Sequence, residues 1–103
     1  MTDLSELRSR SFTDHLHTSF SVEDAGAPVA LRLIQVNEPA TPPNIEFFSL
    51  FFAGPAAPRL PQRIYRIQHE KMGSFDLFLT AVAGDASSIT YEAVFHRLHK
   101  KQP

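Results

Sequence analysis

The segment Ile45–Ala53 (IEFFSLFFA) constrains the fold of this chain more than any other stretch. On an extended backbone its large apolar side chains fall on both sides, with Phe47 and Phe51 on one and Phe48, Leu50 and Phe52 on the other. A strand that is apolar on both sides needs cover on both. It is therefore either central in a packed sheet or part of a barrel wall with further contacts outside.

Five more segments have the alternation or the composition of strands: Thr18–Glu23, Val29–Val36, Gln62–His69, Phe75–Val82 and Ile89–Leu98. Glycine-bearing turns and two proline-rich connections, 37–44 and 54–60, separate them. Sheets of this size must deal with their edges, and closure does so. The sequence therefore predicts a mainly all-β fold, a small six-stranded antiparallel barrel or bent sheet with a short N-terminal helix.

Residues 2–10 (TDLSELRSR) begin with helix-capping residue types and carry Glu6 where a capping box places its acid. We expect one domain over residues 1–103, because a chain this short cannot bury two separate cores. Its parts are an N-terminal helix and cover over 1–17, the barrel over 18–98, and a frayed basic tail over 99–103.

Composition excludes several classes of site and location. The chain has a net charge of −1, which argues against a dedicated nucleic-acid-binding protein. It contains no cysteine, which removes thiol nucleophiles and thiolate metal sites. No apolar run approaches the roughly 20 residues that cross a bilayer, and charged residues interrupt the first twenty positions. We expect a cytoplasmic protein with no membrane contact and no cofactor.

The hairpin Leu60–Val82 holds the densest set of candidate functional residues. His69 and Glu70 are adjacent at its turn, and Tyr65, four residues before His69, lies on the same side of the predicted strand, so an imidazole base or ligand is one interpretation. The alternative is structural: His69 bonds the backbone or Tyr91 and stabilises the turn. Adjacent residues on a strand point to opposite sides, which favours the structural interpretation.

Arg63 and Arg66 complete the candidate site as a basic edge for a ligand or partner. Together with Arg59 and Tyr65 they are also compatible with a strip for an acidic partner or a nucleic-acid strand, although neighbouring acids weaken that interpretation.

Metal binding and serine catalysis find less support. His15 and His17 lie on one side only if their segment is extended, and a third ligand would have to come from elsewhere, so we assign no metal site. Ser49 lies in a strand-like run without a nucleophile elbow. We assign no catalytic residue.

Two stretches resemble a known family. The first is Phe48-Ser49-Leu50 with Phe52 and Gly54-Pro55; the second is Leu60-Pro61-Gln62 with Tyr65, His69 and Gly73, followed by Phe75, Leu77-Phe78-Leu79 and Tyr91-Glu92-Ala93-Val94-Phe95. The pattern is similar to that of a small, uncharacterised bacterial domain-of-unknown-function family, sometimes encoded near phage-tail-collar-like proteins. The resemblance spans nearly the whole chain and implies an all-β domain without an established activity.

The leading functional hypothesis is a non-enzymatic protein-interaction or structural module, with the phage-tail-like association that the resemblance implies. It would bind a protein partner, or a second copy of itself, through a sheet face or the proline-rich loops. The alternative is a small ligand-binding domain or enzyme with a site around His69.

Overall fold

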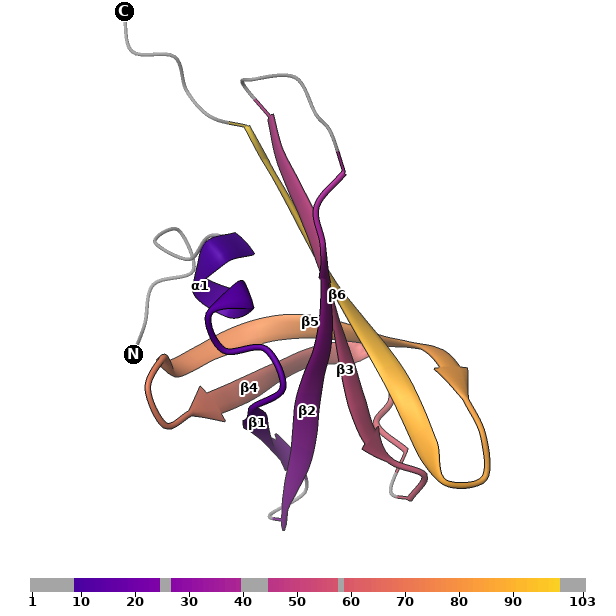
Figure 1. Ribbon diagram of the computed structural model, residues 1–103. Helices are drawn as coiled ribbons and strands as arrows, with labels where there is room; N and C mark the ends of the chain where they lie inside the picture. Colours follow the sequence, from indigo (N-terminus) through magenta and orange to yellow (C-terminus); the bar gives the residue numbers. More distant parts are fainter. Residues whose placement is uncertain (1–8, 25–26, 40–44, 58, 99–103) are drawn as a thin grey trace, which may run out of the picture.

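Six strands and one short helix make up the part of the chain that the computed structural model describes, residues 9–24, 27–39, 45–57 and 59–98. The elements are α1 (Ser9–Thr13), β1 (Ser19–Asp24), β2 (Ala27–Asn37), β3 (Ile45–Pro55), β4 (Arg63–His69), β5 (Gly73–Gly84) and β6 (Ser88–Leu98). The strands form a closed antiparallel barrel in the order β1-β2-β3-β6-β5-β4 (Figure 1). The predicted all-β barrel is confirmed.

The ladder between β3 and β6 is the longest in the barrel. It runs without interruption from Ile45 opposite Leu98 to Pro55 opposite Ser88. Closure is much shorter, because β1 and β4 share only the pairs Ser21–Gln68 and Val22–Ile67. The barrel is therefore held firmly on one side and joined by a short contact on the other.

Both predicted sides of β3 are in contact with protein, but unequally. Phe48, Leu50 and Phe52 are completely buried in the barrel interior. Phe47 and Phe51, on the outer side, are only partly covered. The strand is therefore a barrel wall whose outer side is only partly exposed to solvent, which agrees with one of the two expected arrangements.

Helix α1 contributes one large side chain to the core. Phe12 is fully buried and its ring lies 5.8 Å from that of Phe75, 5.6 Å from that of Phe95 and 6.1 Å from that of Phe48. Phe12 therefore anchors the helix to the barrel core. The helix begins near the end of the predicted span 2–10, whose first seven residues lie outside the described part of the chain, as does the tail 99–103.

Two details of the β4–β5 hairpin bear on the candidate site. Gly73 follows the turn with φ 83, the left-handed conformation that glycine adopts without steric cost. Strand β4 begins at Arg63, one residue after the predicted start at Gln62. The carbonyl of Pro61 instead accepts a hydrogen bond from the Tyr65 hydroxyl, so this residue belongs to the connection before the strand.

Candidate functional site

His69 ends β4 with its side chain buried, only 9% exposed, and both ring nitrogens engaged. Nδ1 accepts hydrogen bonds from the backbone amides of Lys71 at 3.0 Å and Met72 at 3.2 Å. Two N–H donors facing Nδ1 require that nitrogen to be unprotonated, so the proton of the neutral ring is on Nε2. One imidazole thus satisfies two backbone amides of the turn that follows it.

The Nε2 side of the ring continues into a short hydrogen-bond chain. Nε2 lies 2.9 Å from Thr18 Oγ1, and the Thr18 hydroxyl donates to the backbone carbonyl of His15 at 2.6 Å. Because the Thr18 proton is committed to that carbonyl, its oxygen is left to accept from Nε2–H. His69 therefore ties the β4–β5 turn to the segment that leads into β1.

Two rings flank His69 and help set its electrostatics. Its centroid lies 4.4 Å from that of Phe20 and 4.7 Å from that of His15. Burial lowers the pKa of His69 below its ordinary value, the charge of His15 lowers it further, and Glu70 opposes the change. The neutral imidazole that the hydrogen bonds require is therefore also the form that the surroundings favour.

A hollow of about 340 Å³, here called the His69 hollow, lies beside this ring. Its lining includes Ser19, Ser21, Gln68, His69 and Glu70. Glu70 is exposed, so it joins His69 at the rim of this hollow although it follows that residue directly in the chain.

The other candidates lie apart from His69. Tyr65 is buried and donates its hydroxyl proton to the Pro61 carbonyl, at the opposite end of β4. Arg63 stands over the Tyr65 ring, with its guanidinium carbon 4.9 Å from the ring centroid. Arg66 is on the outer side of the barrel, where its Nε donates to Asp76 Oδ1 at 2.7 Å. The structure therefore divides the five predicted residues among three places.

The histidines considered for metal binding do not share a side. Residues 14–17 form turns and His17 has φ 69, so the extended backbone that such a pair needs is not adopted. Among residues 9–24, 27–39, 45–57 and 59–98, no group of three or more His, Asp or Glu side chains could hold a metal ion. No helix in these same ranges is long and apolar enough to span a membrane.

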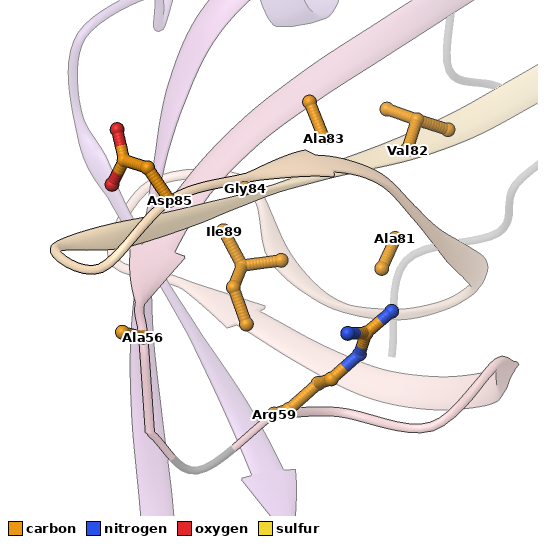
Figure 2. A pocket seen from close by; sticks show the side chains of 8 residues that line it. All are labelled: Ala56, Arg59, Ala81, Val82, Ala83, Gly84, Asp85 and Ile89. Carbon is orange, nitrogen blue, oxygen red and sulfur yellow. The ribbon is translucent and has the colours of Figure 1, made fainter.

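A larger hollow, about 560 Å³, was not anticipated from the sequence (Figure 2). This Arg59 hollow is bounded by small residues at the end of β5 (Ala81, Ala83, Gly84), by Ile89 of β6, and by Ala56 and Arg59 of the connection before β4. Figure 2 shows the Arg59 guanidinium directed across the hollow toward Ala81. The sequence feature that could have indicated this hollow is the three small residues within Ala81–Gly84, which leave space that larger side chains would fill.

Asp85, at the rim of the Arg59 hollow, is occupied within its own turn. Its Oδ1 accepts hydrogen bonds from the Ser87 amide and hydroxyl, both at 2.8 Å, and from the Ser88 amide at 3.0 Å. These hydrogen bonds hold the pKa of Asp85 below its ordinary value, and those from Ser87 have the largest effect. The carboxylate stabilises the β5–β6 turn, and Arg59 has no ion-pair partner among the described residues.

No curated protein and no solved structure matches the chain. A family model described as domain of unknown function DUF6916 matches residues 7–95, which include all but the last three residues of the barrel. The resemblance drawn from the strand and turn residues is therefore confirmed, and the chain belongs to the DUF6916 family.

Proposed function

We propose that this chain is a non-enzymatic protein-interaction module that pairs with a second copy of itself through the outer side of β4, β5 and β6. The observation that carries the proposal is a group of exposed apolar side chains on that side. Ile64 is 66% exposed, Phe78 48% and Val94 53%. We call these three residues the outer-face cluster.

The strand register pairs two members of the cluster directly. Ile64 and Phe78 are direct cross-strand partners in the β4–β5 ladder. The β5–β6 ladder ends at Thr80 opposite Glu92, so Phe78 and Val94 each lie two residues beyond its last pair along their own strands. Three large apolar side chains exposed on neighbouring strands favour contact with a partner, whereas single exposed apolar residues are common and need no partner.

The polar surroundings of the cluster suit a second copy. The next outward pair along the same ladder is Arg66 with Asp76, which is joined by a hydrogen bond and still nearly half exposed. A two-fold contact places the same surface on both partners, so each copy presents both signs of charge to the other. An apolar centre beside a charged, exposed edge is also the usual arrangement of protein interfaces.

Sedimentation equilibrium over a concentration series tests this proposal. We expect the mass to rise toward twice that of the 11.6 kDa chain. Ile64→Ser should weaken the association about 10-fold or more, because burying an isoleucine contributes about 1.5–3 kcal/mol. Ile34→Ser is the matched control, since Ile34 is an exposed isoleucine of β2 outside the cluster, and it should leave the association unchanged. A strictly monomeric wild-type chain would contradict the proposal.

The His69 hollow favours a second candidate function, the binding of a small ligand beside His69. Polar groups of Ser19, Ser21 and Gln68 are available at its rim for hydrogen bonding. The engaged ring nitrogens count against a role for His69 as a base, so a binding role is the form of this candidate that the contacts support. A fragment screen by nuclear magnetic resonance in which no compound shifts the amides of Ser19–Ser21 or Gln68–Glu70 would rule it out.

A further inference from the structure

The Arg59 hollow lies where one ladder of the barrel stops before its neighbour does. The β4–β5 ladder ends at Arg63 opposite Leu79. The β5–β6 ladder continues to Gly84 opposite Ile89. Residues 80–84 of β5 therefore have β6 on one side and no strand of the described chain on the other. Their second edge borders the hollow, whose lining includes Ala81 to Gly84.

The connection that precedes β4 could have extended this ladder, but its polar groups are bound elsewhere. The amide of Leu60 donates to the Tyr91 hydroxyl at 2.9 Å, and the carbonyl of Pro61 accepts from the Tyr65 hydroxyl. Pro61 has no amide proton to offer a neighbouring strand. Among the described residues no backbone hydrogen bond joins 59–62 to 80–84. The two tyrosines thus hold the connection away from β5.

The charge of the hollow is defined by Arg59. Its side chain is exposed, and no carboxylate in the described ranges forms an ion pair with it. The nearby Asp85 carboxylate is held by Ser87 and Ser88, and Figure 2 shows it pointing away from Arg59. A guanidinium in this position can receive a carboxylate through two parallel hydrogen bonds.

We propose that the Arg59 hollow binds an extended peptide that adds as a strand to the free edge of β5, with a carboxylate of the peptide on Arg59. The free edge of five residues is about 17 Å long at about 3.4 Å per residue. Strand addition of this kind obtains its affinity from main-chain hydrogen bonds and its specificity from side-chain contacts. The small side chains of Ala81 and Ala83 leave room for the added backbone.

A bulge in β5 between Ala81 and Ala83 is the feature that opposes this proposal. Bulges increase the local twist of a strand, and many proteins use them to protect an edge. The test must therefore report on the edge amides themselves and not only on binding.

The experiment selects ligands from a random eight-residue peptide library displayed with free carboxyl termini, using immobilised wild-type chain. The most enriched sequence is then synthesised as the free acid and in a form with alternate backbone nitrogens methylated, which cannot pair as a strand. Amide hydrogen exchange of residues 80–84 is measured with each. We expect the acid to slow exchange at these amides about 10-fold or more, which corresponds to about 1.4 kcal/mol of added protection, and the methylated form to have no effect.

Protein variants test the charge. Arg59→Ala should weaken binding of the acid about 10-fold, as expected when a charge-assisted pair is lost. Arg10→Ala is the matched control, because Arg10 is an exposed arginine of α1, and it should bind as wild type does. Failure to enrich any peptide on wild type over Arg59→Ala would overturn the proposal, as would equal binding of the methylated form. Concentration-dependent protection of 80–84 without peptide would also overturn it, since a second copy would then be the occupant.

This peptide site and the outer-face cluster are separate surfaces, and neither proposal depends on the other. Ile64→Ser should leave peptide protection at 80–84 unchanged. Arg59→Ala should leave the sedimentation behaviour unchanged. Failure of one proposal is therefore distinguishable from failure of the other.

Discussion

The two ends of the β4–β5 hairpin use side chains in opposite ways to satisfy the main chain. At the turn, the buried His69 accepts hydrogen bonds from the backbone amides of Lys71 and Met72, which holds the two strands together at that end. At the other end, Tyr91 and Tyr65 bind the connection at Leu60 and Pro61, which keeps it out of the ladder with β5. A buried polar side chain closes a sheet when it bonds the chain's own turn. It leaves a sheet edge unpaired when it instead holds the segment that would otherwise have continued the ladder.

His69, although conspicuous in the sequence, is therefore a weak candidate for catalysis or ligand binding through its ring nitrogens. All its hydrogen-bonding capacity serves the fold. Arg59, at the open end, forms no comparable contacts among the described residues and borders unpaired backbone. The sites proposed for binding lie where the barrel leaves groups unsatisfied or apolar side chains uncovered.

The largest expected effect comes from breaking the closed end. His69→Ala should lower the free energy of unfolding by about 2–4 kcal/mol, because it removes a packed ring and leaves two amides without their acceptor. Urea denaturation measures this loss, and hydrogen exchange should show faster exchange at Lys71 and Met72. His96→Ala is the control: His96 is exposed on β6, and its loss should change stability by no more than about 0.5 kcal/mol. Equal effects of the two variants would refute the role assigned to His69.

A smaller loss is expected at the open end. Tyr91→Phe should cost about 1–3 kcal/mol, because the buried amide of Leu60 loses its acceptor while the ring stays in place. Tyr65→Phe should cost less, about 0.5–1.5 kcal/mol, because Pro61 is exposed and water can replace the hydroxyl at its carbonyl. Urea denaturation of both variants gives the order. The reverse order would show that the connection is held mainly through Pro61.

The sequence was sufficient for the strands and for placing Tyr65 and His69 on one side of β4, because both follow from local alternation. Tyr65, Ile67 and His69 do share the buried side. The sequence was not sufficient for the contacts that make the two ends of the β4–β5 hairpin different. Tyr91 and Leu60 are 31 residues apart and meet only because of how the closed barrel brings distant segments together.

The same reason accounts for the scattered candidate site. Arg66 was grouped with His69 because the two are close in sequence, but alternation along β4 sends Arg66 to the outer side. The Arg59 hollow depends on where one ladder ends relative to the next, and no pattern within either segment specifies that. The outer-face cluster could have been suspected, since Ile64, Phe78 and Val94 all fall on the side opposite the core pattern.

The smallest expected effect is a pH dependence that arises at the closed end alone. Burial lowers the pKa of His69 in the folded chain below the ordinary value of about 6.5 that the unfolded chain keeps. Between those two pKa values the unfolded chain binds more protons, so lowering the pH favours unfolding. The stability contributed by the neutral ring is therefore fully present above about pH 6.5. It declines as the pH falls toward the folded pKa and becomes constant below it.

Urea denaturation from about pH 8 to about pH 5, on either side of the ordinary histidine pKa, measures this dependence. The groups around His69 that share its field are His15, Glu70 and Lys71. His15→Gln should reduce the dependence, because it removes the second cause of the lowered pKa, and His69→Phe should abolish the part that His69 contributes. His96→Gln should retain it in full. Ring-nitrogen chemical shifts should identify the Nε2–H tautomer at neutral pH, and a slope that survives in His69→Phe would mean that the proton-linked group lies elsewhere in the barrel.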